Sequence, residues 1–484
     1  MNSIKKNLLY NSIYQILLFL IPIITAPYIS RVLGTRGIGL YSFNNSIAYY
    51  FVIFTMLGLN NYGNREVART RDDKKKLSKS FFSIYGLQFI CGIITNILYL
   101  LYSFFITNNL ILSISLYPLV LAAMFDINWF YFGVENFRFT IIRNVIIKIL
   151  TTISIFVFVN DMNDVAVYCL ILSIGMLLSN LSLWTLLGKY VDIYIPRWEE
   201  IRIHIRPNLL LFVTVISVSL FKIMDKIMLG VITTSNEVGL YESAEKIIAI
   251  PTAFVLSLGT VMLPRMSNVI AKNDKSRSLE LIENSIIFAI FLSTSLGFGI
   301  MGISKEFVPI FFGDGFEKCI YLLWILLPSS IFIAFANVIR TQYLLPIGDD
   351  KTYVISSIIG AIINLIINYI LIPKLGSIGA AIGTLVSEAS VCFYQTINTK
   401  HVLPIKGYIT DSIVFLVGGI VMFCLLIKLN FDIAIQLLMI SKVIIGVFVY
   451  IILVLILLLL FNKKILNRFM NLLLKKQYNK SKKP

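Results

Sequence analysis

Long apolar runs constrain this chain more than any other feature of its sequence. About fourteen of them approach the roughly 20 residues that an α-helix needs to cross a bilayer. Because a single soluble core could not bury so many long apolar helices, we predict an all-α integral membrane protein. The predicted runs are 9–33, 40–62, 81–106, 110–132, 141–159, 165–187, 208–231, 243–264, 282–304, 319–342, 353–373, 379–400, 407–429 and 436–461.

The charge distribution sets the orientation. The net charge of +17 would suggest nucleic acid as a partner in a soluble protein. Most of the 42 Lys and Arg residues instead lie in alternate loops, as the positive-inside rule describes for cytoplasmic loops. We therefore expect both termini in the cytoplasm, a basic tail resting on anionic membrane lipids, and no nucleic-acid partner.

A short pattern occurs twice in the chain. "IGLYS" at 38–42 and "VGLYES" at 238–243 are both preceded by Leu-Gly, at 33–34 and 229–230. Each copy joins the first and second runs of a six-run set, so we predict two six-helix lobes related by an axis along the membrane normal. The predicted parts are an N-terminal lobe at 1–187, a cytoplasmic amphipathic linker at 188–207, a C-terminal lobe at 208–402, two additional transmembrane helices at 403–461 and a basic cytoplasmic tail at 462–484.

The residues of the repeated pattern have expected roles. Glycine allows a tight turn or a close approach of two backbones. Tyrosine is typical of the membrane–water interface, with its ring in the apolar layer and its hydroxyl in water. One copy could be an ordinary turn at the membrane edge, but two copies at matching places favour an internal duplication.

Six segments together resemble the bacterial polysaccharide-repeat-unit flippases of the Wzx type. These belong to the larger group that includes the lipid II flippases and the multidrug and toxin extruders. The segments are "PYISRVLGTRGIGLYS" (27–42), "LGLNNYGNREVART" (57–70), "DINWFYFGVENF" (126–137), "DKIMLG" (225–230), "EVGLYESAEKI" (237–247) and "LGSIGAAIGTLVSE" (375–388).

The resemblance implies two lobes around a central cavity that opens alternately to each side of the bacterial cytoplasmic membrane. The implied cargo is an undecaprenyl-pyrophosphate-linked oligosaccharide for a surface polysaccharide such as O-antigen or capsule. The implied energy source is an H+ or Na+ gradient, and the chain agrees in having no ATP-binding phosphate loop of the G-x-x-x-x-G-K-[ST] kind. Implied partners are a polysaccharide polymerase and a chain-length regulator.

Cations inside or near the predicted runs are candidate ligands for the diphosphate, because a charge at mid-membrane costs about 2.5–3.5 kcal/mol. Lys222, Asp225 and Lys226 form the densest group, with the two lysines on one helix face. Alternatively, Asp225 neutralises Lys222, and Lys226 reaches the outer interface. Arg31 and Arg36 lie in an outward loop against the positive-inside bias, and arginine binds phosphate bidentately. The alternative, which suits Arg36 better, is contact with lipid phosphate.

Further charges have two interpretations each. Arg340 could meet incoming headgroups or only anchor its helix. Lys148 is expected to extend its side chain to the cytoplasmic surface. Asp126 and Glu388 are intramembrane acids and, with Asp225, are candidates for ion coupling. Either of the first two could instead neutralise a nearby cation, which the predicted position of Asp126 near the cytoplasmic end favours.

Other functions fit less well. A multidrug extruder of the same fold needs acids for cationic drugs, whereas Asp126 is the one intramembrane acid predicted in the first lobe. A membrane enzyme is disfavoured because the outward loops are short and contain no histidine. His204 and His401 lie far apart and the five cysteines have no metal-site spacing, so we expect no metal and no cofactor. A lipid II flippase would differ in its cargo alone and stays an alternative.

Overall fold

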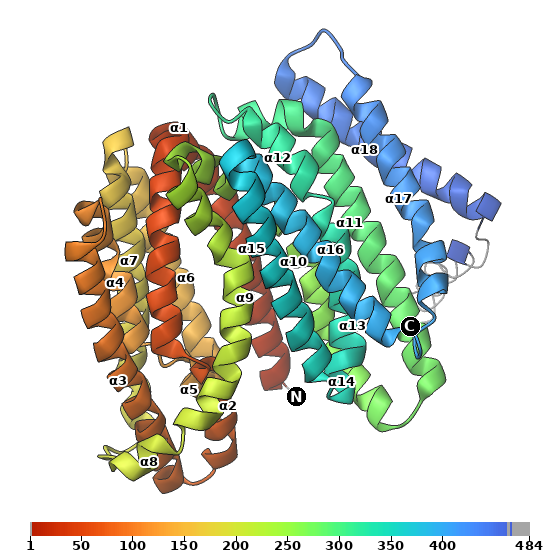
Figure 1. Cartoon of the computed structure of the whole chain (residues 1–484). Coiled ribbons are helices and arrows are strands. Elements are labelled where there is room, and N and C mark those ends of the chain that lie inside the picture. The colour runs from red at the N-terminus through yellow and green to blue at the C-terminus, as the bar shows by residue number, and fades with distance from the viewer. Residues whose placement is uncertain (1, 462–464, 467–484) are drawn as a thin grey trace. The chain divides into compact units, whose positions relative to one another are not determined.

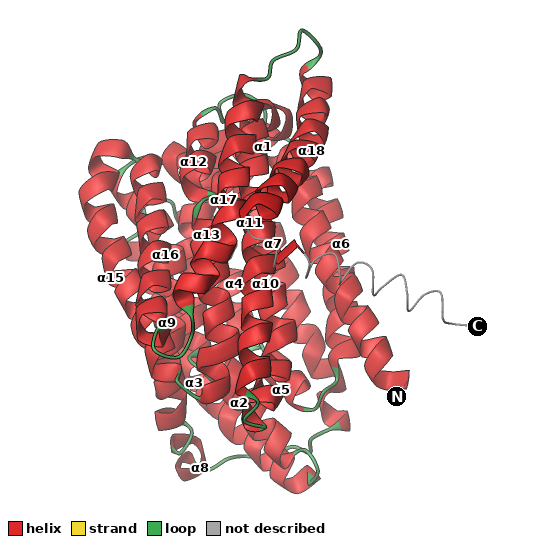
Figure 2. Cartoon of the chain, turned by 90° about the vertical axis from the view of Figure 1, so that its right-hand side faces the viewer, coloured by secondary structure: helices red, strands yellow, loops and turns green. Residues whose placement is uncertain are grey.

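The structure is helical throughout. The computed structural model describes residues 2–461, 465 and 466, with side chains other than those of 2–20, 137–139, 214, 221 and 222. Every regular element in these residues is a helix, and short loops join the helices (Figure 2). The all-α prediction is confirmed, while the predicted tail at 462–484 lies outside the described residues except for 465 and 466.

The predicted membrane spans are present. Within the described residues, twelve helical segments are long and apolar enough to cross a bilayer, and they correspond to the predicted runs from 81–106 onward. The two earlier runs are the two limbs of α1 (Asn2–Met56), which bends at Gly34, where φ is 62°. This left-handed conformation is strained for residues with a Cβ. The prediction of about fourteen spans is therefore confirmed, and the first Leu-Gly marks a turn.

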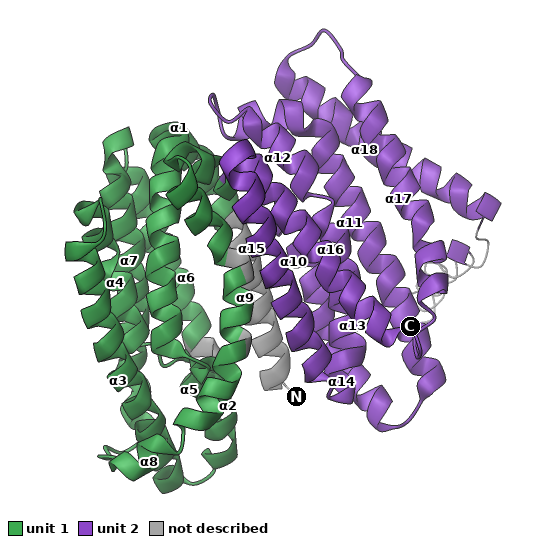
Figure 3. Cartoon of the chain, viewed as in Figure 1, with its two compact units in different colours: residues 1–242 green, residues 243–484 purple. Residues whose placement is uncertain are grey.

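The chain forms two compact units, residues 1–242 and residues 243–484 (Figure 3). Unit 1 ends two turns into α10 (Ser235–Ala271), and unit 2 contains the rest of that helix. The preceding helix, α9 (Ile205–Ile232), packs against α1 and α2 (Leu59–Thr70) in unit 1. The predicted lobe limits and the symmetry axis stay predictions.

Unit 1 is built around α1, which packs against α3, α4, α6 and α9 (Figure 1). The helix α7 packs against α4 and α6. The predicted linker 188–207 contains the end of a 3-10 helix, an irregular segment at 191–197, the short helix α8 and the first residues of α9. The further helices of this unit are α3 (Lys74–Phe105), α4 (Leu110–Met124), α5 (Asn128–Gly133), α6 (Phe137–Phe158), α7 (Val165–Leu183) and α8 (Trp198–Arg202), with 3-10 helices at Met162–Asp164 and Trp184–Lys189.

In unit 2 the central helix is α11, which packs against α13, α17 and α18, while α15 packs along α16. The predicted additional helices are α17 and α18. Both pack against α11, and α18 is also tied to it by a buried ion pair in which Lys442 Nζ lies 2.7 Å from Glu306 Oε1. The helices are α11 (Lys275–Phe311), α12 (Lys318–Leu326), α13 (Ser329–Ile339), α14 (Leu345–Ile347), α15 (Asp350–Leu375), α16 (Ser377–Thr399), α17 (Ile405–Lys428) and α18 (Ile435–Phe461), with a π-helical turn at Arg340–Leu344.

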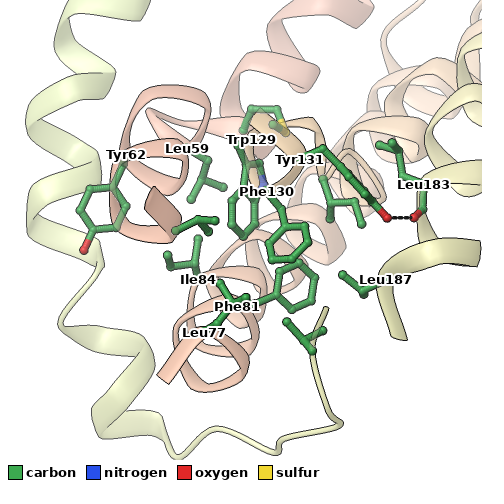
Figure 4. Packing of buried hydrophobic residues seen from close by; sticks show 14 of the residues in the cluster. Leu59, Tyr62, Leu77, Phe81, Ile84, Trp129, Phe130, Tyr131, Leu183 and Leu187 are labelled. Atoms are coloured by element: carbon green, nitrogen blue, oxygen red, sulfur yellow. Dashed lines mark hydrogen bonds between the residues drawn. The ribbon is translucent and has the colours of Figure 1, made fainter. Parts of the chain in front are cut away.

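A buried aromatic cluster holds together the end of unit 1 where α2, α3, α5 and α7 meet (Figure 4). The ring of Phe81 stacks on Trp129 with centroids 5.6 Å apart and meets Phe130 edge-on at 5.0 Å. Each such pair contributes about 0.5–1.5 kcal/mol beyond the area it buries. The Tyr131 hydroxyl donates a hydrogen bond to Leu183 O at 2.5 Å, which ties α5 to the end of α7.

The predicted run 110–132 is one span made of two helices, because α4 and α5 are separated by a break at 125–127. Side chains from other helices satisfy the backbone carbonyls that the break leaves. Gln88 Nε2 donates to Ala123 O at 2.8 Å and to Asp126 O at 2.9 Å, and Trp184 Nε1 donates to Phe125 O at 3.0 Å. A buried carbonyl without a donor costs about 1–3 kcal/mol, so these contacts hold the break in place.

Candidate functional site

The two copies of the repeated pattern meet in unit 1. Gly39 of α1 faces the carbonyl oxygen of Ser235, and Gly239 of α10 faces the carbonyl oxygen of Thr35. Each glycine thus faces the residue four positions before the other, and a Cβ on either glycine would collide with that carbonyl. The predicted close approach of two backbones is confirmed. It also explains why the pattern occurs twice, because each copy supplies the glycine against which the other packs.

One turn further along, the two copies carry different polar residues at the same place. Ser42 follows Gly39 by three residues, as Glu242 follows Gly239. The Ser42 hydroxyl donates a hydrogen bond to Glu242 Oε2 at 2.9 Å, and Lys226 Nζ lies 3.0 Å from the same oxygen. The Lys226 and Glu242 side chains are only 16% and 13% exposed, so they form an ion pair that is mostly removed from solvent.

The neighbouring acid is bound by the tyrosine of the second copy. Asp225 is buried, and its Oδ2 accepts a hydrogen bond from the Tyr241 hydroxyl at 2.6 Å. Tyr241 is itself 2% exposed, so the prediction of a water-exposed hydroxyl is wrong for this copy. The reason is that a buried carboxylate offers the hydroxyl a strong acceptor. We call Ser42, Asp225, Lys226, Tyr241 and Glu242 the corner cluster.

The described charges of the corner cluster are two carboxylates, of Asp225 and Glu242, and the Lys226 ammonium. Lys226 is paired with Glu242 rather than extended into solvent. Lys222, the other lysine of the predicted group, has a side chain outside the described residues, so its role stays a prediction. The described part of the cluster therefore has two acids and one cation, and the Lys226 ammonium compensates one of the two carboxylates.

Arg31 and Arg36 lie on either side of the bend in α1, and both are exposed. Arg31 Nη1 donates a hydrogen bond to Pro27 O of its own helix at 3.0 Å. Arg36 lines a cavity of about 410 Å³ together with Asn109 and Asn163. The predicted contact of both arginines with an anionic headgroup stays a prediction.

Two predicted residues lie in unit 2. Arg340 is the first residue of the π-helical turn, and its Nη2 donates to Asn337 Oδ1 at 2.6 Å. Its guanidinium carbon lies 5.2 Å from the centre of the Tyr353 ring, a cation–π distance. Glu388 is half-buried in α16. Of the eight predicted residues, the structure thus brings Asp225 and Lys226 into one cluster, and the roles of Arg340 and Glu388 stay predictions.

Asp126 lies at the break between α4 and α5. Its Oδ1 accepts hydrogen bonds from the Asn128 backbone N at 3.0 Å and from Asn128 Nδ2 at 2.6 Å. Asn128 Oδ1 in turn accepts from Arg143 Nη2 at 3.2 Å, and Arg143 is only 6% exposed. One amide side chain thus links a carboxylate to a buried guanidinium, which favours the neutralising role among the two predicted for Asp126.

Sequence reasoning missed two of these residues. Glu242 stands at the position of Ser42 when the two copies are aligned, and this acid next to the apolar run 243–264 was the available signal. Arg143 lies at the start of the predicted run 141–159 and was not among the candidate residues. It is the seventh residue of α6 and is buried, because Asn128 and the α7 backbone supply acceptors that no local pattern reveals.

In the described residues, no group of three or more His, Cys, Asp or Glu side chains is placed to hold a metal ion. His204 lies just before α9 and is buried, with its Nδ1 2.6 Å from the Tyr62 hydroxyl. This contact joins α2 to the start of α9.

Known families match the part of the chain that carries the corner cluster. The family described as "Polysaccharide biosynthesis protein" matches residues 4–270, more than half of the 484 residues. The chain belongs to the polysaccharide biosynthesis protein family. The MatE family matches residues 211–370 of this polysaccharide biosynthesis protein. Both matches agree with the resemblance found in the sequence, which is confirmed.

Similar proteins extend the match along the chain. The "Putative O-antigen transporter" of Escherichia coli (strain K12) is 21% identical over 394 residues, which are 80% of this polysaccharide biosynthesis protein and 95% of the relative. A structure of the lipid II flippase MurJ in an inward closed conformation has a TM-score of 0.76 and 17% identity, covering 93% of this chain and 99% of that chain. An inward-facing multidrug resistance MATE family transporter has a TM-score of 0.55 and 15% identity, covering 85% and 100%. At these identities the structural matches show a common fold.

Proposed function

We propose that this protein is a flippase that carries an undecaprenyl-pyrophosphate-linked oligosaccharide repeat unit from the inner to the outer leaflet of the bacterial cytoplasmic membrane. It works by alternating access, draws on a gradient of H+ or Na+, and serves the synthesis of a surface polysaccharide. Both termini lie in the cytoplasm. A polymerase and a chain-length regulator take over the delivered unit.

The match to the Escherichia coli relative carries this proposal, because it covers 95% of a protein named for O-antigen transport. The MurJ-like fold and the family membership agree with it. The matched proteins described above are named as transporters or flippases, so the chain is a transporter rather than an enzyme. The finer points of cargo and coupling rest on the charged residues.

The corner cluster supports a link between cargo and protons. An anionic diphosphate near Lys226 would compete with Glu242 for the same ammonium, which now lies 3.0 Å from the carboxylate. A proton on Glu242 would remove that competition, because the neutral acid no longer attracts the ammonium. We assign Lys226 and Lys222 to diphosphate binding. Arg31 and Arg36 meet the headgroup on the outer side, Arg340 meets it on the inner side, and Asp225, Asp126 and Glu388 stay coupling candidates.

A deletion strain tests the function. Deletion should lower surface polysaccharide and cause lipid-linked repeat units to accumulate, and a plasmid copy should reverse both effects. A Lys226→Gln copy should restore export poorly at normal membrane levels, whereas a control copy with the exposed Lys189→Gln should restore it fully. Unchanged surface polysaccharide in the deletion strain would contradict the proposal. Dissipating the H+ and the Na+ gradients separately in inverted vesicles identifies the coupling ion.

Two alternatives have support of their own. The MatE match at 211–370 favours a multidrug extruder, which predicts greater drug sensitivity of the deletion strain and unchanged polysaccharide. The likeness to MurJ favours a lipid II flippase, which predicts accumulation of lipid II and lysis on depletion. Measuring drug sensitivity, lipid II and repeat-unit lipids in one depletion experiment separates the three functions.

A further inference from the structure

Lys148 lies near the middle of a membrane-spanning helix. It stands eleven residues after the start of α6, or about 16 Å along the axis at 1.5 Å per residue. Its side chain is half-buried, and the described residues include no carboxylate paired with it. The expected position of its ammonium at the cytoplasmic surface stays a prediction, and the structure places this side chain on the wall of a cavity. An ionisable residue at such a depth commonly marks a binding site or a transport path.

The cavity lies between α6 and α7 in unit 1 and has a volume of about 230 Å³. Apolar side chains of both helices form part of its wall. No Asp or Glu is among the described residues that line it. Its polar lining residues are Asn128, Arg143, Asn144, Lys148, Thr151, Ser179 and Asn180.

The two cations of the cavity differ in their surroundings. Arg143 is held by acceptors of the protein, because Nη1 donates to Ser179 O at 2.8 Å and Nη2 donates to Asn144 Oδ1 at 2.7 Å. The Asp126 carboxylate, linked to Arg143 through Asn128, supplies a negative charge nearby. Lys148 has no such carboxylate among the described side chains. With the charges of Arg143 and Asp126 offsetting each other, the described side chains around the cavity keep one net positive charge, that of Lys148.

We propose that this cavity binds the phosphate group of an anionic lipid, with the Lys148 ammonium as its cationic ligand. The sign follows from the net positive charge and from the absence of a lining acid among the described residues. The volume of about 230 Å³ is large enough to admit a phosphate group together with bound water. A lipid is favoured over a soluble anion because the cavity lies on membrane-spanning helices and is partly apolar.

Binding to the purified full-length protein in a neutral detergent tests the site, whatever the protein transports. The probes are farnesyl diphosphate, phosphatidylglycerol, inorganic pyrophosphate and uncharged farnesol, measured by microscale thermophoresis. Lys148→Gln should weaken binding of at least one phosphate lipid about tenfold, because a charge-assisted hydrogen bond is lost. Lys148→Arg keeps the charge and should stay close to wild type, as should the control Lys189→Gln. Thermal unfolding of each variant checks that it is folded.

The probes also identify the source of the phosphate. A Lys148-dependent preference for farnesyl diphosphate points to the prenyl-linked cargo, and a preference for phosphatidylglycerol points to the bulk lipid, both in support of the site. Equal affinity of wild type and folded Lys148→Gln for both lipids would overturn the proposal. So would inorganic pyrophosphate binding as tightly as either lipid, because the site would then recognise a soluble anion. Normal binding with lost export in cells would separate this site from the proposed function.

Discussion

The two corners at 35–42 and 235–242 make the same backbone contact with each other but carry different side chains. In each copy a glycine faces a carbonyl oxygen of the other. The polar residue that follows the tyrosine is Ser42 in the first copy and Glu242 in the second. The backbone contact requires a glycine in both copies, but it does not require the same residue at positions 42 and 242.

The tyrosines of the two corners differ in the same way. Tyr41 packs edge-on against the ring of Tyr168, with centroids 4.9 Å apart, while Tyr241 donates a hydrogen bond to buried Asp225. Residues 37–64 of the first copy contain no charged side chain. The comparison teaches that the duplicated contact preserves a backbone approach, and that one copy alone acquired the charges of the corner cluster.

Alanine at either corner glycine should have the largest effect. The added Cβ of Gly39→Ala or Gly239→Ala would collide with a backbone carbonyl, which no side-chain rotation relieves. We expect each to lower stability by about 3 kcal/mol or more, and the two by similar amounts. The measurement is the yield of monodisperse protein and its unfolding midpoint in detergent. Gly407→Ala, with nothing within 4 Å of its added Cβ, is the control. A Gly39→Ala protein as stable as this control would refute the reciprocal contact.

Breaking the ion pair of the second copy should have the next largest effect. Lys226→Met or Glu242→Gln leaves the partner charge in a mostly buried place, so we expect a loss of about 2–4 kcal/mol. The double variant should be more stable than the sum of the single effects predicts. Unfolding midpoints of the four proteins measure this coupling. Strictly additive effects would mean that the pair contributes nothing.

Exchanging the polar residues sharpens the same test. Because Ser42 Oγ lies 2.9 Å from the Glu242 carboxylate, a glutamate at position 42 should also reach Lys226. The exchanged variant, S42E/E242S, should recover much of the stability that Glu242→Ser alone loses. If the exchanged variant is no more stable than Glu242→Ser, the acid can pair with Lys226 only from position 242.

The tyrosines should respond differently to loss of their hydroxyls. Tyr241→Phe removes a donor from a buried carboxylate, and we expect a loss of about 1–3 kcal/mol. Tyr41→Phe should change stability little, because among the described side chains its hydroxyl has no hydrogen-bond partner. The two unfolding midpoints, compared directly, check the difference, and equal shifts would argue against the distinction between the copies.

Ser42→Ala should have the smallest effect. It removes one hydrogen bond to Glu242 but leaves the ion pair with Lys226, so we expect about 1 kcal/mol. Ser115→Ala, at a half-buried serine whose hydroxyl donates to Ile111 O of its own helix, is the matched control. A loss as large as that of Glu242→Gln would mean that the serine, rather than the lysine, holds the acid.

Much of the fold could be predicted because membrane spans are local in sequence. Apolar length identified the runs, and the first Leu-Gly identified the bend at Gly34. The break inside 110–132 could not be predicted, since Gln88 and Trp184 complete its hydrogen bonds from other helices. A hydropathy profile reports only how apolar a segment is, so it cannot predict where another helix donates hydrogen bonds to a break in the backbone.

The candidate site was predicted in part. Lys226 stood out as a charge in an apolar run, and the alternative to diphosphate binding was a side chain that reaches the outer interface, with Asp225 neutralising Lys222. The structure pairs Lys226 with Glu242, and the Tyr241 hydroxyl donates a hydrogen bond to Asp225. Neighbours along a helix point in different directions, so the partner is decided by the helix that packs alongside.

The sequence by itself determined that this is a many-span helical membrane protein with a corner written twice, because bilayer length and glycine geometry act on short stretches of chain. The tertiary structure alone decided which charges are compensated. Glu242 forms an ion pair with Lys226, and the Asn128 side chain bonds to both Asp126 and Arg143. Lys148 instead lines a cavity. Charge pairing in a low-dielectric interior depends on distances between helices, which the order of residues does not contain.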